Sequence, residues 1–320
     1  ALDVDCTHDR SEAEAFLREV NGEKPARRSL RQQYRDSLKS LDTEEHIDLA
    51  FYRPIGFAWA CLFRRLGISP NAVTIASIFI GVGAGICFYP TALWVNIIGM
   101  LLLMWANSFD SADGQLARRI LDGVSGDFWF AAIYIAICLR TVHGGGVVGL
   151  HPWIIWALAV TAGICHGKQA ALADYYRQMH LFFLKGRAGS ELDSSDQLEE
   201  KDKSLTWSGN FFRKLVAVCY LGYTRSQEAE TPAMQRLRRE VARRWPDGIP
   251  AEFLDASRPL CKWENFLTFN WRTIFLFVTL LIGQPWIYFV IELTLFNGVM
   301  IWLNRRHERI CTRLLREMER

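Results

Sequence analysis

Four aspartates lie close together near the middle of the 320-residue chain: Asp110, Asp113, Asp122 and Asp127. Asp110 and Asp113 are three residues apart, so they share one face of a helix, and Gly114 and Arg118 continue that face over the next turn. Carboxylates bind divalent cations, and a guanidinium pairs with phosphate oxygens. An ion pair between Arg118 and Asp122 would account for a lone aspartate but not for four. The cluster therefore predicts a phosphate-bearing substrate bound through a metal ion.

The segments around these aspartates are almost free of charge. Residues 71–167 contain only seven charged side chains, and six of them lie between residues 110 and 127. A membrane-spanning helix needs about 20 mostly apolar residues. Candidate spans cover residues 72–89, 91–109, 128–142, 147–165 and 266–304, the last divided in two by Gly283-Gln284-Pro285. We predict an all-α polytopic membrane protein with six transmembrane helices.

Arginines flank only one end of the predicted spans, and short loops rich in Lys and Arg face the cytoplasm. The connections at 89–92 and 283–286 contain neither residue type, and the third outer connection has Arg140 alone. Both termini, the aspartates and residues 168–265 are therefore predicted to be cytoplasmic. The flanking arginines are Arg53, Arg64, Arg65, Arg118, Arg119, Arg305, Arg306, Arg309, Arg313 and Arg316.

The predicted organisation has six parts along the chain. They are a cytoplasmic N-terminal segment (1–53), an amphipathic interfacial helix (54–66), a membrane core of four spans that carries the aspartates (67–183), a cytoplasmic insertion (184–263), two further spans (264–304) and a basic cytoplasmic tail (305–320). Trp59 and Phe63 suit the interfacial helix to the lipid headgroup boundary, where it either shapes a lipid entrance or only anchors the protein. Gly81, Gly83 and Gly85 favour close helix packing in the first span.

Composition excludes several other classes. The eight cysteines include no C-x-x-C pair, so we predict neither a zinc site nor a disulfide framework. A net charge of +3 with both signs mixed gives no reason to expect a nucleic-acid partner. The N-terminal residues lack the basic and apolar regions of a secretory signal, so we expect the first span to serve for targeting as well.

The aspartate cluster also carries a resemblance to a known family. Asp110-Ser-Ala-Asp113-Gly114-Gln-Leu-Ala117-Arg118 resembles the opening of the CDP-alcohol phosphotransferase signature, D-x2-D-G-x2-A-R-x(7-8)-G-x3-D-x3-D. Pro70-Asn71-Ala72-Val73-Thr74 is similar to the P-N-x-x-T segment at the start of that family's first span. The resemblance covers about residues 51–180, whereas the last two spans match only in hydropathy.

The second half of the signature departs from the family pattern, and two alignments are possible. In one, Gly123 and Asp127 supply the glycine and the third aspartate, but Ala131 then occupies the fourth acidic position. In the other, about nine residues are absent before Arg119, Asp122 is the third aspartate, and Asp127 lies one residue beyond the fourth position. We favour the second because it retains four carboxylates, although Asp122 and Asp127 are then five residues apart and need a local bulge to share a helix face.

The resemblance implies an enzyme that transfers a substituted phosphate group from a CDP-linked alcohol to an acceptor hydroxyl and releases CMP. Asp110, Asp113 and Asp122 would bind one or two Mg2+ or Mn2+ ions, and Asp127 would be a further ligand or the general base. Gly114 and Ala117 would leave space for the cytidine, with Asn71 and Thr74 nearby, and Arg118 would contact the phosphates. The resemblance also implies a homodimer in the membrane, and we expect the bacterial inner membrane with the active site at its cytoplasmic face.

The sequence is compatible with two kinds of acceptor alcohol. A phosphorylated acceptor, such as inositol phosphate or glycerol phosphate, needs extra cations, for which Arg53, Arg119, Lys168 and Arg177 are candidates. The donor would then be a CDP-lipid, in phospholipid or inositol-sphingolipid synthesis. The alternative is a lipid alcohol acceptor, diacylglycerol or ceramide, with CDP-ethanolamine or CDP-choline as donor.

A rival class is an ion-coupled transporter, which would hold acids near the bilayer midplane. Here the acids lie at one membrane face, and no broken helices recur in matching halves. A catalytically inactive relative acting as a scaffold is a third possibility. Glu292, inside the last predicted span, is expected to pair with a neighbouring helix or to lie at a dimer interface.

Overall fold

The computed structural model describes residues 42–116, 124–144, 151–186, 227–246 and 248–320, together with eight separate residues: Gln32, Tyr34, Val147, Glu199, Lys214, Leu221, Thr224 and Arg225. All regular secondary structure in this part of the chain is helical, which confirms the all-α class. The elements are η1 (Asp48–Tyr52, a π-helix), α3 (Arg53–Leu66), α4 (Pro70–Cys87), α5 (Leu93–Leu116), α6 (Val124–His143), α7 (Pro152–Lys185), α10 (Pro232–Arg244), α11 (Ile249–Phe266), α12 (Phe269–Leu281), α13 (Ile287–Ile291), η3 (Glu292–Phe296, a π-helix) and α14 (Asn297–Met318).

Local sequence signals explain where several helices begin and end. The Ser69 hydroxyl caps α4 by accepting from the Ala72 N–H at 3.4 Å, and Pro70 occupies the first turn. Helix α3 ends at Gly67, whose φ of 69° is left-handed and suits glycine. Gly283, with a φ of 77°, makes the turn between α12 and α13. The turn predicted at Gly283-Gln284-Pro285 is therefore confirmed.

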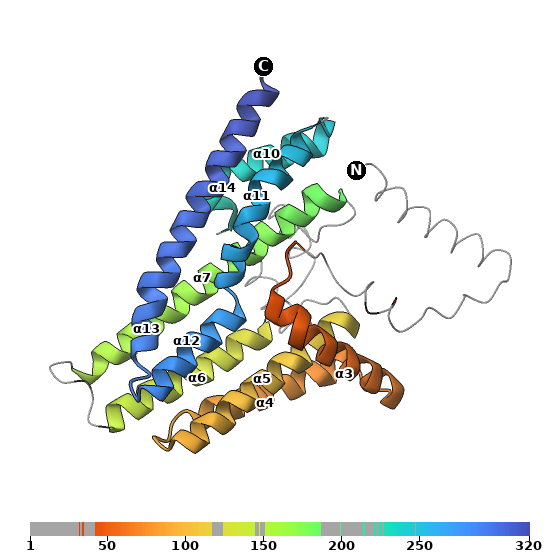
Figure 1. The fold of residues 1–320 in the computed structure, drawn as a ribbon. Helices are drawn as coiled ribbons and strands as arrows, with labels where there is room; N and C mark the ends of the chain where they lie inside the picture. Colours follow the sequence, from red (N-terminus) through yellow and green to blue (C-terminus); the bar gives the residue numbers. More distant parts are fainter. Residues whose placement is uncertain are drawn as a thin grey trace.

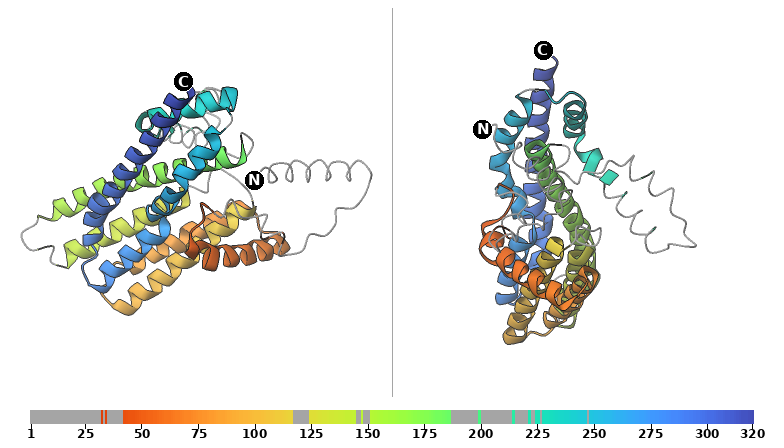
Figure 2. Two further views of the ribbon diagram at one scale, coloured as in Figure 1. Left: turned by 45° about the horizontal axis from the view of Figure 1, so that its top comes forward. Right: turned by 90° about the vertical axis from the view of Figure 1, so that its right-hand side faces the viewer.

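Two groups of helices make up the molecule. Helices α4, α5, α6 and α12 lie side by side, whereas α7 and the continuous α13–η3–α14 helix pass along them and extend further (Figure 1). Beyond the bundle, α10 and α11 pack on α7 and α14, around buried side chains that include Met234, Leu237 and Phe253. The two views of Figure 2 show the same division. Part of the predicted insertion therefore shares a core with the ends of two long helices.

The glycines of α4 allow a close approach to α6, as predicted. A Cβ on Gly81 would overlap the indole of Trp129, and one on Gly85 would lie 3.0 Å from the Ala132 backbone and side chain. A Cβ on Gly83 would meet nothing within 4 Å. Two of the three glycines therefore serve helix packing, and the third faces open space.

Three helices are long and apolar enough to cross a membrane: Pro70–Cys87, Leu93–Ala112 and Ile287–Met318. Phe128–His143 in α6 is a shorter apolar helix. The fourth predicted span, 147–165, differs from the structure, in which α7 runs from Pro152 to Lys185. The helix continues because the apolar side chains of its second half, among them Leu172, Met179 and Phe183, pack in the core with α10, α11 and α14.

A buried ion pair joins α12 to η3. Arg272 Nη1 donates to both oxygens of Glu292, at 2.5 and 2.8 Å, and both side chains are almost fully buried. The hydroxyls of Tyr134 and Tyr288 donate to the same carboxylate at 3.2 and 2.6 Å. Arg272 Nη2 donates to Gln169 Oε1 at 2.8 Å. The expectation that Glu292 pairs with a neighbouring helix is confirmed, and five elements meet at this pair: α6, α7, α12, α13 and η3.

Removing one partner of this pair is expected to destabilise the protein strongly. In Glu292→Ala the Arg272 guanidinium stays buried without a counter-charge, which costs about 3 kcal/mol of unfolding free energy. The double variant Arg272→Met/Glu292→Leu, which removes both charges, should recover most of that loss. Thermal or denaturant unfolding of the purified protein measures the free energy of unfolding of each variant. Glu317→Ala, in the exposed Arg313–Glu317 pair, is the control. A Glu292→Ala variant as stable as the parent would contradict a structural role for the pair.

Candidate functional site

The predicted aspartate cluster begins at the C-terminal end of α5. Asp110 is partly buried there, and α5 continues through Asp113 and Gly114 to Leu116. The backbone therefore places Asp110 and Asp113 one turn apart on the same helix, as the spacing predicts. Asp127 belongs to the first turn of α6, which begins at Val124. The two ends of the motif thus lie on consecutive helices joined by seven residues.

Much of the candidate site lies outside the described residues. This applies to Ala117, Arg118, Arg119 and Asp122, and to the side chains of Asp113 and Asp127. Among the side chains that the structure does describe, no three His, Cys, Asp or Glu could hold a metal ion together. The predicted carboxylate ligands are the donor type that Mg2+ and Mn2+ prefer, and Asp110 is the one whose side chain is described.

The P-N-x-x-T segment forms the first turn of α4. The Thr74 hydroxyl is buried and donates to the Pro70 carbonyl at 3.1 Å, which stabilises the start of the helix. Asn71 is exposed in the same turn. The described contacts therefore give Thr74 a structural role in α4, and the amide of Asn71 is accessible at the surface.

Each described cation predicted to bind the acceptor faces a carboxylate. Arg53 forms two hydrogen bonds to Glu44, at 2.9 and 2.7 Å. Lys168 lies 3.1 Å from Glu230 and Arg177 lies 3.4 Å from Asp174. A phosphorylated acceptor would have to compete with these carboxylates for the cations.

A group of side chains that the sequence did not single out lies beside η1. Asn270 Nδ2 donates to Glu45 Oε2 at 2.7 Å and to Asp48 Oδ1 at 2.9 Å, and the Thr268 hydroxyl donates to Glu45 Oε1 at 2.7 Å. Burial raises the pKa of both carboxyls, although these hydrogen bonds oppose the rise, and Arg177 opposes it further. No spacing rule links residues 45 and 48 to residue 270, so only the tertiary structure shows this group.

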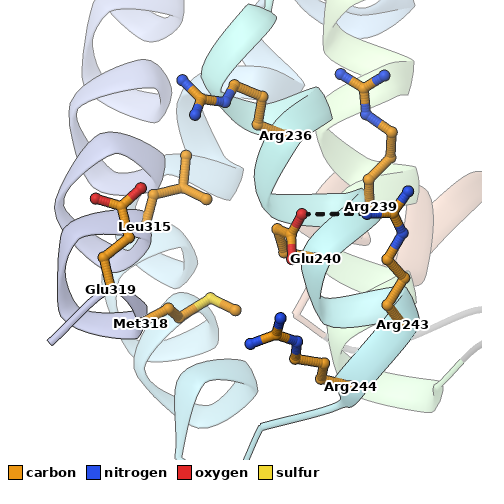
Figure 3. Close-up of a pocket in the computed structure, with 8 residues that line it drawn as sticks. All are labelled: Arg236, Arg239, Glu240, Arg243, Arg244, Leu315, Met318 and Glu319. Atoms are coloured by element: carbon orange, nitrogen blue, oxygen red, sulfur yellow. Dashed lines mark ion pairs between the residues drawn. The ribbon is translucent and has the colours of Figure 1, made fainter.

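An arginine-rich cleft lies between α10 and α14, away from the aspartates. Its volume is about 550 Å³, and Leu315 and Met318 line its α14 side. Figure 3 shows Arg244 directed into the gap, whereas Arg239 and Arg243 project to the other side of α10. Arg243 pairs with Glu240 at 3.6 Å. The guanidinium groups therefore do not converge on one point, and the cleft is not the predicted phosphate site.

A scan against protein-family models, a search of curated proteins and a search of solved structures each gave no match to this chain. Functional assignment therefore depends on the aspartate motif and on where the helices place it.

The buried carboxyl of Glu45 predicts a specific pH dependence. A carboxyl whose pKa is raised by folding holds its proton more tightly in the folded state, so stability falls as pH rises above the usual Glu range. Glu45→Gln removes this charge and keeps an acceptor for Asn270. We expect the melting temperature of the variant, relative to the parent, to increase from pH 4.5 to pH 7.5, since these limits lie near and well above the ordinary Glu pKa.

Thermal unfolding across that pH range measures the difference, with the exposed Asp255→Asn as a control that should show no such trend. A difference that stays constant, or that shrinks as pH rises, would exclude this role for Glu45.

Proposed function

We propose that the protein is a metal-dependent CDP-alcohol phosphotransferase of the membrane. The observation that carries the proposal is the Asp110-x2-Asp113-Gly114-x2-Ala117-Arg118 sequence at the end of a helix that is long and apolar enough to cross a membrane. The position supports the proposal because water-soluble nucleotides reach carboxylates at a membrane face, and not those at the bilayer centre. An ion-coupled transporter would require acids nearer the midplane.

Six transmembrane helices with cytoplasmic termini are part of the same proposal. Besides the three long apolar helices, α7 exposes Trp153, Val160 and Ile164, and α12 exposes Val278 and Leu281. Apolar side chains on the outside of a bundle suit a lipid environment. The α4–α5 and α12–α13 turns lie at one end together with the end of α6, as alternating spans require (Figure 1).

Arg140 is the exception to the charge pattern, and its contacts explain it. The side chain is buried, and Nη1 donates to the carbonyls of Phe88 and Pro90, both at 3.1 Å, and to Asn96 Oδ1 at 2.8 Å. It therefore stabilises the α4–α5 turn and does not act as a free loop charge. The proposed outer face remains poor in exposed cations among the described residues.

In the proposed reaction, an acceptor hydroxyl attacks the phosphorus attached to the donor alcohol, the bond to the CMP phosphate breaks, and CMP leaves. Bound Mg2+ or Mn2+ would neutralise the diphosphate and stabilise the charge that develops in the transition state. Asp110, Asp113 and Asp122 are the proposed ligands, and Asp127 is the proposed base or a further ligand. Gly114 and Ala117 leave room for the nucleotide, and Arg118 pairs with its phosphates.

The donor is proposed to be a CDP-lipid and the acceptor a polar alcohol such as inositol phosphate or glycerol phosphate. Transfer from CDP-ethanolamine or CDP-choline to diacylglycerol or ceramide is the second candidate. It is favoured by the carboxylate partners of Arg53, Lys168 and Arg177, which leave these cations less available for a phosphorylated acceptor. Both candidates release CMP, so one assay detects either.

Purified protein with Mg2+ or Mn2+ is expected to release CMP from a CDP-alcohol, and Asp113→Asn should abolish that release by removing a ligand charge. Asp255→Asn, an exposed acid on α11 outside the motif, is the matched control and should retain turnover. Mass spectrometry of the products, with CDP-diacylglycerol or CDP-ethanolamine and a panel of acceptors, identifies the acceptor. Unchanged turnover in Asp113→Asn would refute the assignment.

Labelling of single cysteines tests the proposed topology. Gln284→Cys, in the exposed α12–α13 turn, should react with a membrane-impermeant maleimide added to intact cells. Arg316→Cys, in the proposed cytoplasmic tail, should react only after permeabilisation, and a background without reactive native thiols is the control. Equal labelling at both positions in intact cells would exclude the six-span arrangement.

A further inference from the structure

We propose that η1 and α3 hold in place the turn of α5 that carries Asp110, with Tyr52 and Gly56 as positioning residues for the phosphotransfer site. This inference depends on the proposed function for its consequence, but the contact itself is a property of the fold. Helices α3 and α5 pack along each other at the end of α5 that carries the motif (Figure 1).

Gly56 brings the α3 backbone against the motif. A Cβ added to Gly56 would lie 2.7 Å from Ser111 Oγ, 3.0 Å from Ser111 Cβ and 3.1 Å from the Ser111 carbonyl carbon. Ser111 follows Asp110 directly and precedes Asp113 by two residues. Because the hydroxyl can rotate but the backbone carbon cannot, a side chain at position 56 would push the two helices apart at the aspartates.

Tyr52, one helical turn before Gly56, contacts the same turn of α5. The side chain of Asn107, three residues before Asp110, lies close enough to the Tyr52 hydroxyl to lower the pKa of that group. The Ser111 hydroxyl donates to the Tyr52 carbonyl at 3.5 Å. Tyr52 is only 5% exposed, and burial raises the pKa of its hydroxyl to about 12, so the group remains protonated over the physiological range. The Tyr52 carbonyl thus contacts α5 just after Asp110, at Ser111, and the Tyr52 hydroxyl lies near Asn107, one turn before Asp110.

Aromatic packing continues the contact along α3. Phe109, the residue before Asp110, has its ring 5.1 Å from that of Trp59 and 5.2 Å from that of Phe63, with both pairs edge to face. The last turn of α3 exposes Leu62 and Leu66 beside Arg64 and Arg65, as an interfacial helix would. The helix that is suited to the membrane surface is therefore also the helix that supports the aspartate turn.

Gly56→Ala tests the contact, and Gly83→Ala is its matched control. Alanine is favoured over glycine inside a helix, and a side chain at position 83 would meet open space, so Gly83→Ala should leave stability unchanged or improve it. Gly56→Ala should act in the opposite direction. Hydrogen exchange of residues 107–113 is expected to accelerate in Gly56→Ala and to match the parent in Gly83→Ala. Equal exchange in the two variants would overturn the inference.

A metal-binding measurement links the contact to the site. Gly56→Ala should raise the dissociation constant for Mn2+, followed by electron paramagnetic resonance, by about tenfold, as loss of a supporting residue around a metal site does. The double variant Gly56→Ala/Ser111→Gly, which removes two of the three close contacts, should recover part of the affinity. A variant that lost affinity only through general unfolding would not be rescued in this way.

Tyr52→Phe provides a variant that keeps the packing. It removes only the hydroxyl beside Asn107, so the protein should fold normally and show weaker Mn2+ binding with faster exchange at residues 107–113. Unchanged exchange in both Tyr52→Phe and Gly56→Ala would refute the positioning role. If exchange responds but the parent protein neither binds Mn2+ nor releases CMP, the contact stands and the proposed function fails.

Discussion

A charged pair inside an otherwise apolar bundle constrains most of the fold. Arg272 and Glu292 come from different helices, and both are almost completely removed from solvent. Charges in such a position are costly unless each finds its partner and its remaining hydrogen bonds. The surrounding polar side chains come from α6, α7 and α13, so these helices must keep one register relative to α12 for the pair to be satisfied. A π-helix begins at Glu292 itself, where the helix regularity changes.

Several carboxylates outside the motif are bound by the protein's own side chains. Glu292 accepts hydrogen bonds from Arg272, Tyr134 and Tyr288, so the protein itself occupies its carboxylate. Glu45 and Asp48 are likewise bound by Asn270 near the start of α3. Asp110 and Asp113 lie instead in the last two turns of α5, and Asp127 lies in the first turn of α6.

Much of the helical plan could be read from the sequence because it depends on local properties. The apolar segments, the turn at Gly283 and the close packing at Gly81 were all predictable from residue type and spacing. The extension of α7 beyond its apolar first half was missed. Its second half mixes polar and apolar side chains, and burial by α10, α11 and α14 is what makes its apolar side chains part of a core.

The sequence alone determined the chemistry to expect, since the types and spacing of Asp110, Asp113 and their neighbours are properties of one short segment. It also determined that this segment follows an apolar helix. Only the tertiary structure decided that Gly56 and Tyr52 contact the α5 turn at Ser111, next to Asp110, and that Arg272 is the partner of Glu292. The reason is physical: contacts within one helix follow from its periodicity, but contacts between helices depend on packing, which brings together residues with no fixed separation along the chain.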